Sequence, residues 1–358
     1  MKRILIILIF LTTLYSCSDK GEYDYVSVKV LFMPNAFVEE DTSEDVDPYD
    51  EDTSDDEDDI VSSDEEETTR DNDSQDILSL VKSCKIKYDF SLEYVIPESY
   101  EEAEETYLSW LSESDTDNTI IIIATNLYDD MLTQYQSNIG SQQILVCGSD
   151  IGKTLPVYSY ELCTYGASFL IGNMGYIWTE DKECLFLGAY QNDKYDEALA
   201  GYTLGFQYLG GKTVTPSYLS TVSEAEGRTM TTEAYDYAAN NLKTGASFVF
   251  AFAEEANYGV YDYLNENVEY YAAGSSYCEE IESGKILGTI YNCHGYCTYD
   301  YLVGMLRKRG INSYSKFGLD SGYITTAISY NYTYYIYDRI FNYYYTAVDY
   351  ENEYLSTL

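Results

Sequence analysis

Short apolar segments alternate with amphipathic ones along most of this chain, and this alternation limits the fold more than any other feature. Residues 119–124 (TIIIIA) are apolar throughout, as expected of a strand in a parallel sheet that is covered on both faces. Residues 101–111 (EEAEETYLSWL) instead repeat their apolar positions at helical spacing. Such alternation predicts βαβ units, and hence an α/β protein with parallel sheets.

The same patterns predict further elements. We expect strands at residues 25–32, 90–96, 119–124, 143–146, 184–188, 214–219, 247–252, 269–273, 286–291 and 323–330. We expect helices at residues 74–83, 101–111, 127–136, 164–178, 195–208, 231–242, 258–264 and 299–309. These units are too many for one ordinary sheet, so they predict two Rossmann-like lobes joined by a hinge of several strands.

The expected lobes are built from four segments of the chain. The first lobe would cover residues 25–160 and the second residues 161–285. Residues 286–320 would return to the first lobe, and residues 321–358 would form a last crossover segment. Ligands of open α/β sheets sit beyond the carboxyl ends of the strands, so a solute would bind between the lobes, which could close on it by hinge motion.

The N-terminus is typical of an exported protein. Residues 1–16 combine two basic residues, a short apolar run and a small residue before Cys17. The run is well short of the ~20 residues that span a bilayer. Residues 14–17 (LYSC) resemble a lipobox, which implies acylation of Cys17 and a polar tether over 17–24; an ordinary cleaved signal is the alternative. We expect anchoring to a bacterial envelope membrane, with the outer membrane favoured and surface exposure left open.

The net charge of −42 at pH 7 argues against nucleic acid and anionic membrane surfaces as partners. Residues 39–76 hold 21 of the 62 acidic residues and a single base, Arg70. So polar a segment cannot bury enough apolar surface to become ordered, and we expect a disordered acidic insertion. Calcium binding there is not favoured, because the segment has no glycine-punctuated calcium loop.

The spacing of the cysteines does not determine which of them form disulfides. Seven remain besides Cys17, so at least one thiol stays free if the others pair within the chain. Residues 293–297 (CHGYC) contain the only histidine, His294, but zinc usually needs a second ligand pair, which is not visible. We expect a disulfide or buried thiols near a hinge, and no metal. A single histidine also excludes most hydrolase templates, so we expect neither an enzyme nor a cofactor.

Five segments resemble the basic membrane protein (BMP) family of substrate-binding lipoproteins, which are similar to purine-nucleoside receptors with a type I periplasmic binding protein fold. These are residues 119–132 (TIIIIATNLYDDML), 155–172 (LPVYSYELCTYGASFLIG), 186–206 (FLGAYQNDKYDEALAGYTLGF), 248–264 (FVFAFAEEANYGVYDYL) and 271–302. Their order and spacing carry the resemblance, which covers most of the chain after Asp73. It implies capture of a nucleoside-like solute for an ABC-type uptake system with a permease partner.

The positions at which the family contacts its nucleoside carry different residues in this chain. Ser275 stands where the resemblance places an aspartate for the ribose hydroxyls, and Asn292 stands where it places a lysine. The acidic insertion occupies the region of a stacking aromatic, for which Phe37 or residues 71–76 could substitute. The departures imply either a different ligand or lost binding.

Ten side chains at predicted strand ends are candidates for ligand contact. They are Asn126, Tyr128, Asp150, Tyr165, Asp196, Tyr202, Glu254, Asn257, Ser275 and Asn292. Asn126 and Tyr202 are preferred, because their positions after strands resemble ligand-contacting ones. For each residue the alternative is a helix cap or a solvated loop position.

The 43 tyrosines are dense near the C-terminus, in residues 329–345 (SYNYTYYIYDRIFNYYY). They predict helix and strand faces that use tyrosine in place of phenylalanine or leucine, with a glycan-binding surface as the less favoured alternative. Taken together, the patterns predict a lipid-anchored solute-binding protein. The alternative is a surface interaction or sensing lipoprotein that keeps the fold without transport.

Overall fold

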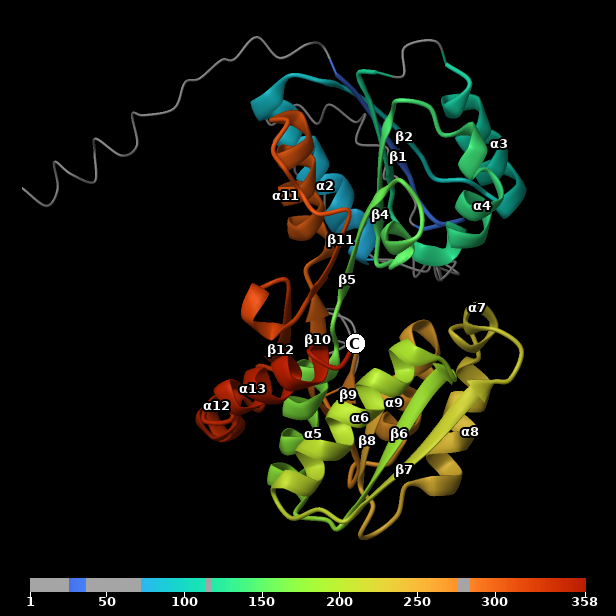
Figure 1. Ribbon diagram of the computed structural model, residues 1–358. Coiled ribbons are helices and arrows are strands. Elements are labelled where there is room, and N and C mark those ends of the chain that lie inside the picture. Colours follow the sequence, from blue (N-terminus) through green and yellow to red (C-terminus); the bar gives the residue numbers. More distant parts are fainter. Residues whose placement is uncertain (1–25, 37–71, 114–116, 276–283) are drawn as a thin grey trace, which may run out of the picture.

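The computed structural model describes residues 26–36, 72–113, 117–275 and 284–358. These residues form two α/β lobes, one above the other in Figure 1, each built on a six-stranded sheet. The α/β class with two lobes is therefore confirmed. Cys17, Phe37, most of the acidic segment and Cys278 lie outside the described residues.

The sheet of the first lobe is parallel throughout, in the order β11-β5-β4-β3-β1-β2. Its strands are β1 (Ser27–Leu31), β2 (Ser91–Val95), β3 (Thr119–Ile123), β4 (Gln143–Cys147), β5 (Tyr158–Leu162) and β11 (Tyr314–Phe317). The helices on one face are α2 (Asn72–Tyr88) and α11 (His294–Leu306), and those on the other are α3 (Tyr100–Leu111) and α4 (Asp129–Gln134).

Strand β3 shows why a segment can be apolar at every position. Successive side chains of a strand point to opposite faces of the sheet. Ile120 and Ile122 belong to the core under α2 and α11, whereas Ile121 and Ile123 belong to the core under α3 and α4. Both faces of the strand are therefore buried.

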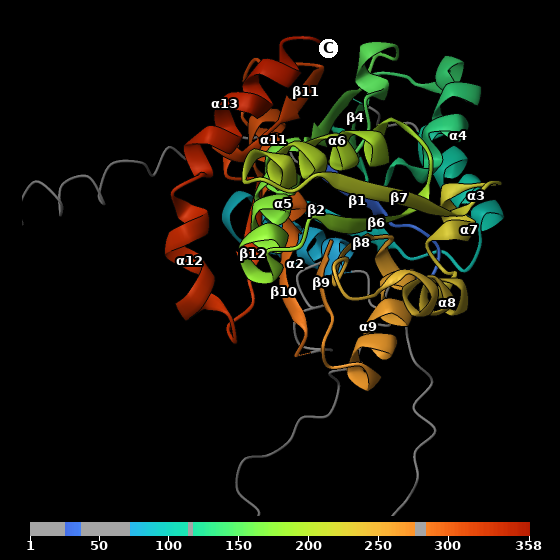
Figure 2. The ribbon, with the colours of Figure 1, turned by 90° about the horizontal axis from the view of Figure 1, so that it is seen from below.

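The sheet of the second lobe has the order β12-β10-β9-β8-β6-β7, with only β12 antiparallel to its neighbour. Its strands are β6 (Glu183–Tyr190), β7 (Thr213–Ser220), β8 (Phe248–Phe252), β9 (Tyr271–Gly274), β10 (Ile286–Asn292) and β12 (Ile324–Ile328). Its helices are α5 (Tyr165–Thr179), α6 (Asp193–Tyr208), α7 (Glu224–Gly227), α8 (Thr231–Asn241), α9 (Asn257–Glu266), α12 (Thr333–Phe341) and α13 (Tyr344–Leu355). Figure 2 shows α5 and α6 on one face of this sheet and α8 and α9 on the other.

The chain passes between the lobes three times within the described residues. β5 leads into α5, β10 leads into α11, and β11 leads through the short turn η5 (Leu319–Ser321) into β12. Backbone hydrogen bonds join these passages: Cys163 N donates to Phe317 O (2.7 Å), and Cys293 N donates to Tyr323 O (2.7 Å). We call residues 162–165, 292–294 and 317–324 the hinge.

The return to the first lobe begins later than the boundary expected at residue 286. Strand β10 pairs with β9 in the second sheet, so the first lobe resumes only at α11. An apolar strand fits either sheet equally well, and its pattern does not reveal which neighbour it joins. Strands β5 and β11 and helices α7, α12 and α13 were not among the expected elements.

No helix among the described residues is both long enough and apolar enough to cross a membrane.

Candidate functional site

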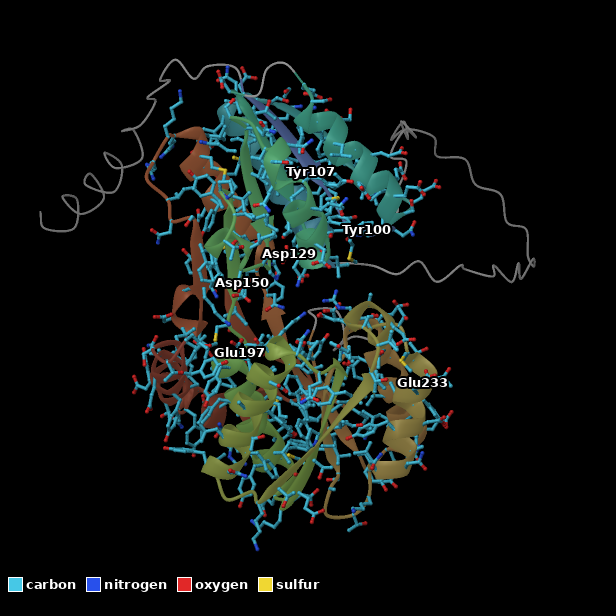
Figure 3. All side chains as sticks on the ribbon, turned by 45° about the vertical axis from the view of Figure 1, so that its right-hand side comes forward. Tyr100, Tyr107, Asp129, Asp150, Glu197 and Glu233 are labelled. Carbon is cyan, nitrogen blue, oxygen red and sulfur yellow. The ribbon has the colours of Figure 1, made fainter. Side chains whose placement is uncertain are left out.

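The two sheets point the same ends of their strands at each other. β5 ends where the chain enters the second lobe, and β10 ends where it enters the first. All strands parallel to these two therefore end on the side that faces the other lobe. In Figure 3, Asp129 and Asp150 lie on this side of the first lobe, and Glu197 lies on the opposing side of the second. We call the two opposed sides the interlobe face.

Four charged side chains of the second lobe meet on this face, and they come from the segments that follow three strands, β6, β7 and β8. Lys194 Nζ lies 3.3 Å from Glu224 Oε1 and 3.3 Å from Glu254 Oε1. Arg228 also contacts Glu224, and its Nη1 lies 3.1 Å from Glu254 Oε2. We call Lys194, Glu224, Arg228 and Glu254 the ion cluster.

Local structure fixes the positions of these side chains. Asn192 caps α6 by accepting from Lys194 N (3.1 Å) and Tyr195 N (3.2 Å), which sets the first turn just after β6. Ser223 caps α7 in the same way after β7, so that Glu224 and Arg228 lie one turn apart. Glu254 follows β8 with a positive φ of 55°, an unusual conformation for a residue other than glycine.

The charged groups of the cluster shift one another's pKa values. Burial alone would raise the pKa of Glu224, but Lys194 and Arg228 outweigh it and hold that pKa at about 2. Burial likewise disfavours the charged forms of Lys194 and Arg228, yet the neighbouring carboxylates raise the pKa of both. All three groups are therefore charged at neutral pH. Arg228 Nε is buried and has no hydrogen-bond partner among the described residues, which leaves it as a donor.

The first lobe contributes Asp73, at the start of α2. Burial, together with the nearby carboxylates of Glu254 and Asp76, raises the pKa of Asp73 to about 7, although Lys194 and Arg228 oppose the rise. Because Glu254, Lys194 and Arg228 all act on Asp73 through space, the start of α2 lies near the ion cluster. Asp76 also accepts from Tyr291 Oη of β10 (3.3 Å), which joins the two lobes beside the hinge.

A second carboxylate of the first lobe is Asp129, which begins α4 after β3. Its Oδ2 accepts from Ser149 Oγ (2.7 Å), while its buried Oδ1 has no partner among the described residues. Burial raises the pKa of Asp129 to about 6, and the Ser149 hydrogen bond offsets only part of that rise. The interlobe face thus carries acceptors on the first lobe opposite paired donors and acceptors on the second.

The structure puts several predicted candidates on the interlobe face. Glu254 belongs to the ion cluster. Asn257 is buried behind it and donates to Ser275 Oγ (3.2 Å), so these two support each other at the ends of β8 and β9. Asn126 begins the turn after β3, and Asp150 follows β4, where it pairs with Lys153 (3.1 Å). Asn292 ends β10 at the hinge, and its buried Oδ1 has no partner among the described residues.

Four other candidates have different surroundings. Tyr128 and Tyr202 are fully buried in the cores of their lobes, because each ring fills space beneath a sheet rather than beyond its strand ends. Tyr128 Oη donates to Phe32 O (2.9 Å). Tyr165 stacks on Tyr354 of α13 (4.5 Å between ring centroids), and Asp196 accepts from Tyr218 Oη (2.8 Å).

The sequence reasoning missed Lys194, Glu224, Arg228 and Asp129, and it named Asp73 only within residues 71–76, as a substitute for the stacking aromatic. A signal was present for the two cations: in a chain with 20 basic residues against 62 acidic ones, Lys194 and Arg228 both fall within the first turn or two after a predicted strand.

The CHGYC segment forms part of the hinge and contains buried thiols. Cys293 and Cys297 are both free, and burial raises the pKa of each thiol. His294 Nδ1 lies 3.3 Å from Tyr160 Oη, which also contacts Thr298 Oγ1 (2.9 Å). Among the described residues, no group of three His, Cys, Asp or Glu side chains is arranged to hold a metal.

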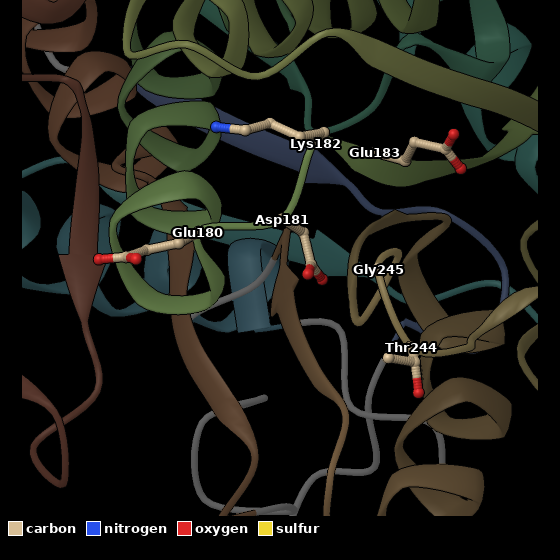
Figure 4. Close-up of a pocket in the computed structure, with 6 residues that line it drawn as sticks. All are labelled: Glu180, Asp181, Lys182, Glu183, Thr244 and Gly245. Atoms are coloured by element: carbon tan, nitrogen blue, oxygen red, sulfur yellow. The ribbon is translucent and has the colours of Figure 1, made fainter.

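Two concavities of the described surface lie elsewhere on the second lobe. One, of about 350 Å³, lies at the amino ends of β6 and β8 and is lined by Glu180, Asp181, Lys182, Glu183, Thr244 and Gly245 (Figure 4). The other, of about 200 Å³, lies between α5 and α12.

No protein-family model and no curated protein matches the chain. Solved structures do match. A solute-binding protein of an ABC transporter system from Aeropyrum pernix is 13% identical with a TM-score of 0.59, over 84% of this chain and 76% of that one. A periplasmic solute-binding protein of an ABC transporter from Actinobacillus succinogenes, with bound D-allose, is 10% identical with a TM-score of 0.59, over 87% and 100%. A transcriptional activator of comK from Bacillus halodurans is 8% identical with a TM-score of 0.64, over 89% and 96%.

The chain has the type I periplasmic binding protein fold. At these low identities the similarity describes the fold alone. Within this fold the interlobe face is the place where the strand ends of both sheets converge, and the ion cluster lies there.

Proposed function

We propose that this protein captures a small polar solute between its lobes and closes on it by bending at the hinge. The ion cluster carries the proposal, because it gathers charged donors and acceptors from three strand ends at the place where open α/β sheets bind ligands. Charge-assisted hydrogen bonds of this kind suit hydroxyl and amide groups. The solute-binding proteins of the same fold support the role.

Nucleosides and sugars are the two ligand classes proposed for this site. The BMP resemblance suggests a nucleoside, whereas one similar structure holds D-allose. An ABC permease would receive the solute from a protein anchored to the bacterial envelope through acylated Cys17. Radiolabelled palmitate incorporation, compared between the native protein and Cys17→Ser, tests the anchor; equal labelling of the two would refute it.

Thermal shift and titration calorimetry with a panel of nucleosides, hexoses and amino acids test the capture. A solute at 100 times its Kd stabilises the folded state by about 2.7 kcal/mol, which is a shift of several degrees. We expect Lys194→Gln and Arg228→Gln to weaken binding at least tenfold. Lys212→Gln, an exposed lysine of the same lobe, is the matched control. No response to any panel member, or equal binding by all three variants, would count against capture at the interlobe face.

A sensing role is the second candidate, because one similar structure is a transcriptional activator. Sensing and uptake share the solute-binding step and differ in the protein that receives the loaded form. Pull-down of the solute-loaded and solute-free protein from envelope extracts separates the two roles: a permease points to uptake, and a signalling partner points to sensing.

A further inference from the structure

A basic surface lies at the C-terminal ends of α2 and α11. The whole chain has 62 acidic residues against 20 basic ones, yet residues 77–90 and 301–312 contain six of those bases and a single acid, Asp89. Ile86 of α2 lies among the bases and is 89% exposed. The six basic residues are all exposed: Lys82, Lys85, Lys87, Arg307, Lys308 and Arg309. We call these six residues and Ile86 the basic patch.

The two helices bring the patch together because they run parallel. At their ends, Lys87 Nζ and the guanidinium carbon of Arg307 each lie 5.3 Å from the ring centroid of Tyr88. At their starts, a Cβ atom on Gly295 would lie 2.8 Å from Asp76 O. Helix α11 begins at the hinge, so both helices end on the side of the first lobe that faces away from the second lobe (Figure 1). The 17-residue helix α2 is about 25 Å long, which separates the patch from the interlobe face.

The patch combines positive charge with an apolar centre. Lys85, Lys87 and Arg309 form no ion pair with any residue that the structure describes. Clusters of about four to eight Lys and Arg residues are typical of surfaces that bind anionic lipid headgroups. An exposed apolar side chain such as Ile86 can enter the boundary between headgroups and acyl chains.

The described chain also starts beside the patch. Val26 O accepts from Ser91 N (3.1 Å), and Ser91 follows the end of α2 by three residues. From Cys17 to Val26 the chain spans at most about 30 Å, even when fully extended. If Cys17 is acylated, this end of the first lobe therefore stays within about 30 Å of the lipid surface.

We propose that the basic patch docks on the anionic lipid surface of the membrane that holds the anchor. The proposal rests on the proposed acylation of Cys17 for the nearness of the membrane, and on the charge and place of the patch for the contact. One acyl chain alone gives marginal binding, to which a basic surface adds a second attachment. Docking would hold the interlobe face about 25 Å above the lipid, with the second lobe outermost.

The net charge of −42 disfavours long-range attraction to an anionic surface. At physiological ionic strength, however, screening limits the reach of each charge to about 8 Å, so the nearest side chains decide the contact. The residues that flank the acidic segment, Ala36 and Asn72, follow the end of β1 and begin α2, on the side of the lobe opposite the patch.

Flotation with lipid vesicles tests the docking separately from the anchor. The chain from residue 18 keeps every described residue and lacks the acylated cysteine. At about 0.1 M NaCl it should bind phosphatidylcholine vesicles that contain phosphatidylglycerol at least tenfold more tightly than pure phosphatidylcholine vesicles. Higher salt, about 0.5 M, should abolish the difference. Absence of this preference would overturn the docking and leave the anchor to the palmitate experiment.

The triple variant Lys85→Gln/Lys87→Gln/Arg309→Gln should lose at least tenfold in binding to phosphatidylglycerol vesicles, because each basic residue at an anionic surface contributes about fivefold. Ile86→Ser should also weaken binding. The changed positions are all exposed, and an unchanged melting temperature checks that the variants fold.

The matched control makes the same change in net charge on the second lobe. It is Lys212→Gln/Lys243→Gln/Arg339→Gln, at three exposed positions, and it should bind normally. Equal losses in the two triple variants would overturn the proposal. So would binding that appears only after deletion of residues 39–70, since the acidic segment would then be the occupant of the patch.

Discussion

Two buried carboxylates tie the hinge together. Glu197 of α6 accepts from Thr164 N (2.7 Å) and pairs with Lys316 Nζ of β11 (2.7 Å). Glu351 of α13 accepts from Gly166 N (2.9 Å) and Leu319 N (2.6 Å). Each carboxylate therefore links the first passage between the lobes to the third, and the angle between the lobes depends on their hydrogen bonds.

Glu351 is expected to make stability depend on pH. Burial raises its pKa to about 7, and the hydrogen bonds from Gly166 and Leu319 offset only part of that rise. The unfolded carboxyl titrates near 4.3, so between these values the folded state holds a proton that the unfolded state has lost. Stability from this group is present below pH 4 and falls as the pH rises through 7, by about 3 kcal/mol in all.

Urea unfolding at pH 5 and pH 8 checks this. The difference in unfolding free energy between the two pH values should shrink by roughly 2–3 kcal/mol in Glu351→Gln, which cannot ionise. Glu353→Gln, two residues away and exposed, should retain the native pH dependence. Identical profiles for all three proteins would show that Glu351 is ionised without penalty.

The Lys316–Glu197 pair should behave as a buried ion pair. The Glu197 side chain is 4% exposed and that of Lys316 is 18% exposed. Lys316→Met leaves a buried carboxylate without its cation, and we expect a loss of about 3–5 kcal/mol in unfolding free energy. The double variant Lys316→Met/Glu197→Gln should recover a large part of that loss in the same urea experiment. A double variant no better than Lys316→Met would mean that packing, and not charge, dominates.

At the scale of elements, the close contact between α5 and α6 orients the second lobe towards the hinge. A Cβ atom at Gly205 would lie 2.0 Å from Phe169 O, and one at Gly201 would lie 2.1 Å from Tyr165 O. The two helix backbones therefore touch, and only glycine permits this separation.

Gly205→Ala should force these helices apart. Overpacking of this kind costs about 1–3 kcal/mol, and we expect the upper end because backbone atoms cannot move aside. Thermal unfolding measures the effect. Gly310→Ala, at a position with open space around it, should change the melting temperature little. Equal effects of the two substitutions would contradict the packing argument.

Elements with strong periodicity could be predicted from the sequence, and weakly patterned ones could not. β3 reads as a strand because both of its faces are buried. β11 (YSKF) is partly exposed at a sheet edge, so its residues carry no such signal. Helix α12 buries Ile336 and Ile340 and exposes Asp338 and Arg339. Its many tyrosines also favour strands, so the segment carries no clear helix signal.

The site was predicted only in outline. The rule that strand ends bind ligands selects Glu254, Asn126 and Asp150, which the structure places at strand ends on the interlobe face; their contact with a ligand stays a prediction. It fails for Tyr202, which lies within α6 beyond its first turn and points into the core. The ion cluster itself depends on which strand ends are neighbours in the sheet. No single segment of the sequence determines that strand order.

At the scale of the whole molecule, charge repulsion is expected to oppose folding. A net charge of −42 destabilises a compact state, and salt screens that repulsion. Raising NaCl from 20 to 500 mM at pH 7.5 should increase the melting temperature by roughly several degrees, despite screening of the ion cluster. The increase should be smaller at pH 4.5, where many carboxylates are neutral. A decrease with salt would mean that favourable ion pairs outweigh the net repulsion.

The three passages between the lobes also affect how the nascent chain can fold during synthesis. Helix α11 and strand β11, which complete the core and sheet of the first lobe, lie after almost the whole second sheet in the sequence. At about 5–20 residues per second, the ribosome makes them roughly 10–30 s after β5. Throughout that interval the apolar face that α11 will cover has no partner. The nascent protein is therefore a natural client for a holding chaperone.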